Sequence, residues 1–133
     1  MKGLKVLLGS TLLLLVILAN FSCSTKTEEE PDVVVNIEVS KNGYNPDNIT
    51  VKQGQVVLFK IKALDEGIGN DYTEKYYGHC FYILPPYDVM VENIKKGETK
   101  SVKVKMVYPG DFIFTCPYCS GIFPTKGELH VVK

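Results

Sequence analysis

The sequence contains no arginine and no tryptophan, and only two of its 133 residues are histidine. Without arginine the chain lacks the forked side chain that binds phosphate in two places at once, so nothing favours nucleic acid as a partner. No nucleophile–base pair of recognisable spacing and no glycine-rich phosphate loop is present, so an enzyme is not expected. No window combines a helical hydrophobic period with caps, which argues against a helical domain.

The first 22 residues predict a lipoprotein-like signal peptide. Lys2 and Lys5 precede an apolar run over residues 12–19, as in bacterial export signals. The run is short for a membrane-spanning helix, which needs about 20 apolar residues, but an uncleaved anchor stays open. Because the small residue Ser22 precedes Cys23, we expect lipidation at Cys23; the alternative is a plain secretory signal. The protein is then expected on the periplasmic or cell-surface side, anchored to a membrane.

The next segment, residues 23–32, predicts an acidic flexible tether. It has no hydrophobic residue after Cys23 and contains three consecutive glutamates. Residues 33–133 remain as a single domain of about 100 residues, which is enough for one core. Removal of Lys2 and Lys5 with the signal leaves 13 lysines against 15 acidic residues, so the mature chain is close to neutral.

The domain consists of short alternating segments separated by turn residues, which predicts strands. Asn42-Gly43 and Asn45-Pro46-Asp47 are expected to be turns. Seven or eight short strands at this spacing predict an all-β, antiparallel Greek-key β-sandwich or barrel. An immunoglobulin-like domain without a site is less favoured, because tryptophan and the long cysteine spacing are absent. The strands are expected at residues 33–39, 48–52, 55–62, 79–84, 88–92, 99–107, 111–116 and 127–132.

Three cysteines, Cys80, Cys116 and Cys119, lie in this domain. An odd number of cysteines cannot all pair within one chain. In an oxidising compartment a free cysteine tends to be oxidised unless a metal or burial protects it. The cysteine count therefore favours a metal site.

Strand alternation indicates which of these cysteines can approach the histidine His79. His79 and Cys116 lie at strand ends with the parity of the expected core, and Cys119 can fold back from the following turn. Cys80 is expected to face the other way, with Tyr82, and is the weakest of the three candidates. An imidazole and two thiolates at one end of a sandwich suit copper.

Several motifs occur in an order typical of one family: residues 44–54 (YNPDNITVKQG), 79–83 (HCFYI), 96–99 (KGET), 109–116 (PGDFIFTC) and 126–131 (KGELHV). In these motifs the chain from Val33 to Lys133 resembles the cupredoxins. Relatives of this kind include the blue copper proteins and the dinuclear-copper (CuA) domains of cytochrome oxidase subunit II and nitrous oxide reductase. The resemblance implies a β-sandwich of the cupredoxin type with copper at one end.

The resemblance implies copper ligands at only some of the positions where the family carries them. His79 matches the first histidine ligand and Cys116 matches the thiolate. Cys119 stands where mononuclear members carry a second histidine, and residues 124–125 stand where an axial methionine is usual. Two residues separate the cysteines where the dinuclear domains have three. An ordinary blue-copper site and an ordinary dinuclear site are both poorly matched.

Two weaker ligands remain for a fourth position: the carbonyl of Gly78, as the resemblance implies, and Cys80. A solvent molecule is the further alternative. One nitrogen and two thiolates favour Cu(I), and zinc is less favoured.

The sequence therefore predicts an exported, membrane-tethered copper protein. It would pass single electrons, cycling between Cu(I) and Cu(II), or carry Cu(I) to a redox or copper-accepting protein partner. One alternative is a metal-free accessory module with a Cys116–Cys119 disulfide, and another is a thiol–disulfide redox protein, because such a pair oxidises readily outside the cytoplasm.

Overall fold

The computed structural model describes residues 27–67, 78–119 and 125–133. The predicted signal peptide (residues 1–22) and Cys23 lie outside the described residues. Within these ranges no helix is long and apolar enough to cross a membrane.

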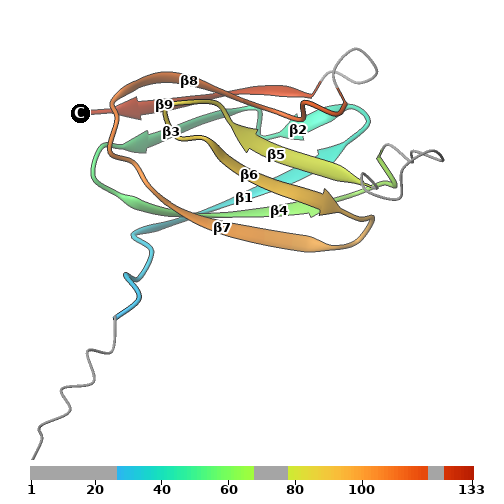
Figure 1. Cartoon of the computed structure of the whole chain (residues 1–133), viewed down its shortest axis with the longest axis horizontal. Helices are drawn as coiled ribbons and strands as arrows, with labels where there is room; N and C mark the ends of the chain where they lie inside the picture. Colours follow the sequence, from blue (N-terminus) through green and yellow to red (C-terminus); the bar gives the residue numbers. More distant parts are fainter. Residues whose placement is uncertain (1–26, 68–77, 120–124) are drawn as a thin grey trace, which may run out of the picture.

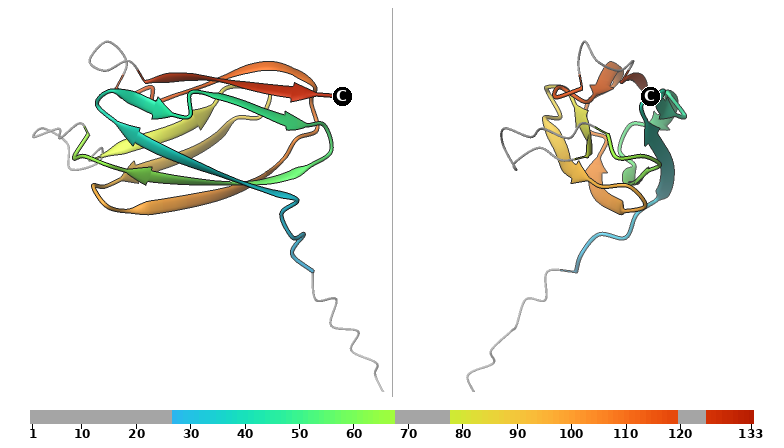
Figure 2. Two further views of the ribbon diagram at one scale, coloured as in Figure 1. Left: turned by 180° about the vertical axis from the view of Figure 1, so that it is seen from behind. Right: turned by 90° about the vertical axis from the view of Figure 1, so that its right-hand side faces the viewer.

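The described part of the chain is built from strands arranged in two sheets (Figure 1). The four-stranded sheet has the order β2-β1-β4-β7, and the five-stranded sheet has the order β3-β9-β8-β5-β6. The end-on view in Figure 2 shows the strands surrounding one core, which confirms the predicted all-β sandwich. The strands are β1 (Val33–Ser40), β2 (Gly43–Asn45), β3 (Asn48–Lys52), β4 (Val56–Ala63), β5 (His79–Ile83), β6 (Val89–Ile94), β7 (Thr99–Lys105), β8 (Gly110–Thr115) and β9 (Lys126–Val132).

The expectation of a purely antiparallel arrangement is wrong for two strand pairs. β1 pairs with β4 in parallel, and β3 pairs with β9 in parallel. Between β1 and β4 the chain crosses to the other sheet to form β3, so it re-enters the first sheet running in the original direction. The remaining pairs, such as β5 with β8, are antiparallel.

The short strand β2 lies where the sequence predicted only turns. It pairs antiparallel with the end of β1 and buries Tyr44. The Tyr44 ring lies edge-on to Phe81 and Phe114, with ring centroids 6.1 and 5.1 Å away. Its hydroxyl donates a 2.5 Å hydrogen bond to the carbonyl oxygen of Cys80. Burial raises the pKa of the Tyr44 hydroxyl far above its usual value, with a smaller contribution from Cys80, so the group stays a donor.

The core joins the two sheets through aromatic rings that the alternation pattern placed inward. The ring centroids of Phe59 and Phe81 are 5.4 Å apart, and those of Phe81 and Phe114 are 5.2 Å apart. All three side chains are fully buried. Phe81 lies in β5, which begins with His79, and Phe114 lies in β8, which ends just before Cys116. Their packing therefore holds the two strands that carry the predicted site residues in a fixed position.

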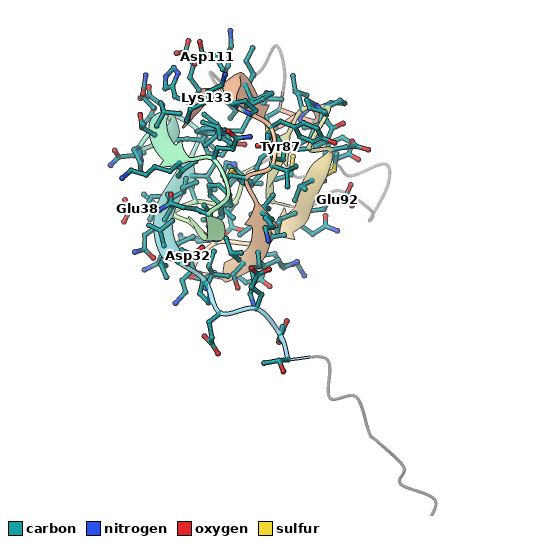
Figure 3. All side chains as sticks on the ribbon, turned by 90° about the vertical axis from the view of Figure 1, so that its left-hand side faces the viewer. Asp32, Glu38, Tyr87, Glu92, Asp111 and Lys133 are labelled. Atoms are coloured by element: carbon teal, nitrogen blue, oxygen red, sulfur yellow. A yellow bond between two sulfur atoms is a disulfide. The ribbon has the colours of Figure 1, made fainter. Side chains whose placement is uncertain are left out.

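The strand register brings the predicted site residues to one end of the sandwich. His79 begins β5 opposite Ile94, the last residue of β6, and Thr115 at the end of β8 lies opposite Lys126 at the start of β9. β1 starts at the other end, and the C-terminus lies there too (Figure 1). Figure 3 looks onto that far end and shows Asp32, where the chain enters the sandwich, together with Lys133.

Candidate metal site

The histidine at the head of β5 is buried and uses only one of its two ring nitrogens. His79 is 1% exposed, and its Nε2 lies 2.5 Å from Oδ1 of Asp65. Its Nδ1 is buried and has no hydrogen-bond partner among the described residues. A buried polar atom without a partner costs about 1–3 kcal/mol. Because the Asp65 carboxylate only accepts, Nε2 is assigned the proton and Nδ1 the free lone pair, the form in which histidine binds a metal.

Asp65 is itself held in place by the backbone around it. The N–H of Lys41 donates to its Oδ2 over 2.9 Å, and the N–H of Gly67 donates to its Oδ1 over 3.3 Å. Partial burial acts to raise the pKa of the Asp65 carboxyl, but these two N–H groups and the His79 imidazole outweigh it and lower the pKa. A fixed carboxylate on the second ring nitrogen is the usual partner of a metal-binding histidine.

Nothing in the sequence indicated that Asp65 pairs with His79. Asp65 follows β4 in an irregular stretch, and no motif or spacing links it to a histidine 14 residues later. The link depends on the backbone bridge between Gly67 and Gly78. A Cβ atom on Gly67 would lie 2.6 Å from the carbonyl carbon of Gly78 and 3.0 Å from Cδ2 of His79. Only glycine lets the two segments approach so closely.

Replacing Asp65 by asparagine is expected to lower stability at neutral pH and to have little effect in strong acid. Because the folded-state pKa of Asp65 is depressed, its stabilisation is present above the ordinary aspartate pKa of about 3.9 and is lost as the pH falls through the folded value. The measurement is urea unfolding of both proteins as a function of pH. A stability difference that grows as the pH falls would contradict this assignment.

Cys116 and Cys119 form a disulfide in the structure. The sequence favours metal-bound thiolates, with this disulfide as the alternative. They flank a tight turn in which the N–H of Cys119 donates to the carbonyl of Cys116 over 3.1 Å. The turn sets the two Cα atoms 5.2 Å apart, within the range that a disulfide spans. In this oxidation state neither sulfur is a thiolate, so metal binding by the pair requires reduction first.

Cys80 lies with the paired cysteines, although strand parity placed it on the face of its strand opposite His79. It is 1% exposed and belongs to one buried cluster with Cys116 and Cys119, separate from the main core. Alternation correctly placed Phe81 and Ile83 of β5 in the core. It could not predict that the turn after β8 would cover Cys80 on the other face of the strand. The N–H of Tyr118, inside that turn, donates to the Cys80 sulfur.

The Cys80 thiol is protected from oxidation by its raised pKa as well as by its burial. Burial chiefly raises its pKa to about 12, opposed by the Tyr118 N–H and assisted by the negative charge of Glu92. Glu92 lies on the outside of β6 (Figure 3), where its Oε1 accepts a 2.9 Å hydrogen bond from the Tyr118 hydroxyl. Without a metal, Cys80 therefore stays a protonated thiol while its neighbours are oxidised.

The turn is also fixed to the start of β9. The N–H of Cys116 and the hydroxyl of Thr115 both donate to the carbonyl of Thr125, over 3.3 and 2.7 Å. The cysteine turn is thus tied to β6 on one side and to the β9 segment on the other. Its position does not depend on the disulfide alone.

The structure brings the predicted residues together in two groups. The three cysteines form one group, and His79 with Asp65 forms the other. The Gly78 carbonyl oxygen lies against Gly67, 2.7 Å from where a Cβ would stand. In this disulfide state the described ranges contain no set of three or more His, Cys, Asp or Glu side chains that could hold a metal ion. The donors in the described part of the chain are buried sulfurs and an imidazole nitrogen without a hydrogen-bond partner there, and they fit a soft ion such as Cu(I) once the disulfide is reduced.

Comparison with known proteins gives one family and one fold. The sequence model of a family described as a cupredoxin-like domain matches residues 12–131. No curated protein matches the chain significantly. Among solved structures, the metal-binding domain of the Cu(I)-exporting P-type ATPase CopA of Streptococcus pneumoniae D39 is 20% identical with a TM-score of 0.54, covering 80% of this chain and 92% of that one. A reduced auracyanin from Roseiflexus castenholzii is 17% identical with a TM-score of 0.57, covering 79% and 100%.

Proposed function

Because this chain belongs to the cupredoxin-like domain family, we propose that it is an exported copper protein that carries Cu(I) and is not an enzyme. The observation that carries this proposal is the buried Nδ1 of His79, which has a lone pair and no hydrogen-bond partner within residues 27–67, 78–119 and 125–133. His79 would supply that nitrogen, and Cys116 and Cys119 would supply thiolates after reduction. The Gly78 carbonyl is the additional weak donor. Copper bound there supplies a one-electron centre or a transferable ion.

Carriage is favoured over electron transfer by the donor set. Fast electron transfer needs ligands that suit Cu(I) and Cu(II) equally, whereas thiolates without a second histidine favour Cu(I). Cys119 occupies the position where mononuclear members of the family carry the second histidine ligand. In the structure Cys119 is paired with Cys116. The CopA metal-binding domain, whose structure is described as holding Cu(I), has the same fold and supports the proposal.

The position of the tether suits presentation of the site to a partner. Residues 27–32 enter the sandwich at the start of β1, at the end opposite His79 (Figure 1). If Cys23 carries a lipid, the copper end points away from the membrane and toward a redox or copper-accepting protein. Asp32 ties the entry point to the sandwich, because its carboxylate accepts the N–H of Val56 over 2.8 Å.

The test is copper binding by the oxidised and the reduced protein, followed anaerobically by metal analysis and visible absorption. We expect the reduced protein to bind Cu(I) tightly without colour and the disulfide form to bind it at least 100-fold more weakly. An intense thiolate-to-Cu(II) absorption that survives repeated oxidation and reduction would show electron transfer instead of carriage.

The disulfide itself favours a second candidate, a thiol–disulfide redox protein or a metal-free accessory module. The same experiment distinguishes it. Protein that binds no Cu(I) in either state, but whose disulfide exchanges readily with a dithiol, would establish the redox candidate; an inert disulfide would establish the accessory module.

A further inference from the structure

We propose that Cys80, Cys116 and Cys119 together form a three-sulfur site for Cu(I), and that the Cys116–Cys119 disulfide is its closed state. The inference rests on the proposed function and deepens it, because it adds Cys80 to the ligands and makes occupancy depend on the redox state of the pair. His79 is then an additional nitrogen donor rather than the third principal ligand.

The first support is the placement of the three sulfurs. The cysteines come from the head of β5 and from the turn after β8, yet they form a single buried cluster of their own. Each is at most 1% exposed. A buried cysteine is often only a small apolar side chain, but three in one cluster provide the donor type that Cu(I) prefers in a water-excluded place.

The second support is the way the turn is attached to Cys80. The backbone of Tyr118, within the turn that carries the other two cysteines, hydrogen-bonds the Cys80 sulfur. An N–H donor strengthens when its acceptor becomes negative, so the same contact stabilises a metal-bound thiolate. The Tyr118 hydroxyl bond to Glu92 holds the turn over β6 in the same position.

The third support is that opening the site requires little rearrangement. Reduction by a dithiol breaks the Cys116–Cys119 bond, delivers two electrons and two protons to the sulfurs, and leaves the dithiol as its own disulfide. The turn hydrogen bond from Cys119 to Cys116 and the bonds to Thr125 do not involve the sulfurs. Both thiols therefore stay beside Cys80, and Cu(I) binding displaces their protons.

The experiment counts the sulfur ligands directly. The full chain carrying Cys23→Ser, which leaves only the three domain cysteines, is reduced, loaded anaerobically with Cu(I) and analysed by X-ray absorption at the copper edge. We expect three sulfur neighbours per copper. Cys80→Ala in the same background is expected to leave two sulfurs and to weaken Cu(I) binding at least 10-fold in a chelator competition. His79→Ala is the matched comparison and should keep all three sulfurs.

The outcomes of this experiment distinguish the three-sulfur site from copper carriage as such. Cu(I) bound by two sulfurs, with affinity unchanged in Cys80→Ala, would overturn the three-sulfur site and leave copper carriage standing. Absence of Cu(I) from the reduced chain would overturn both. If Cys80→Ala fails to fold, the sulfur count of the unsubstituted cluster still decides.

Discussion

Replacing Cys116 by serine is expected to weaken Cu(I) binding by at least about 100-fold, since loss of an outer-shell partner alone typically costs 10–100-fold. Cys116 follows β8 directly, and its backbone is fixed to Thr125. No other cysteine can take its place at that position. A hydroxyl is a hard donor and a poor substitute for thiolate toward Cu(I). The measurement is competition with a Cu(I) chelator under anaerobic, reducing conditions.

The matched control for Cys116→Ser is Cys23→Ser, which removes a cysteine ahead of the described domain and should leave Cu(I) affinity in the sandwich unchanged. Melting temperatures of both variants show whether the fold is retained. Unchanged affinity in a folded Cys116→Ser protein would exclude the turn after β8 as the copper-binding element.

Replacing Gly78 by alanine is expected to destabilise the fold by about 3 kcal/mol or more, because two penalties combine. Gly78 has φ of +101°, a conformation that side chains disfavour. An added Cβ would also lie 2.8 Å from the carbonyl carbon of Ile94, in the neighbouring backbone. Relief requires the start of β5 to move, which carries His79 away from Asp65. Urea unfolding measures the loss of stability.

Gly54→Ala separates the two penalties. Gly54 has φ of +88°, but a Cβ there would meet nothing within 4 Å. Only the conformational cost of about 1–2 kcal/mol is expected. Equal losses in Gly54→Ala and Gly78→Ala would mean that β5 and β6 do not approach as closely as the structure has them.

The strand pattern was predictable because alternation is a local property. In β4, Phe59 and Ile61 are fully buried and the lysines between and after them are exposed, as their parity indicates. β2 was not predictable, because Gly43 and Asn45 are turn-forming residues and the strand depends on pairing with β1. The parallel pairs depend on the order of strands in space, which alternation does not encode.

The site was predictable in its parts and not in its connections. The motif around His79 and the cysteine spacing marked three residues, but the pairing of Asp65 with His79 depends on two glycines meeting across a loop. Burial of Cys80 depends on a turn that comes from another strand. Oxidation of Cys116 and Cys119 depends on the distance that this turn sets. Such contacts between distant segments leave no periodic signal in a single sequence.

The end of the sandwich that carries His79 and the cysteines is expected to bind copper. An anaerobic titration of the reduced full chain with Cu(I), followed by metal analysis after desalting, tests it most directly. We expect one tightly bound Cu(I) per chain, retained through desalting and released when the cysteines are oxidised. A fully reduced, folded chain that retains no copper would contradict the claim.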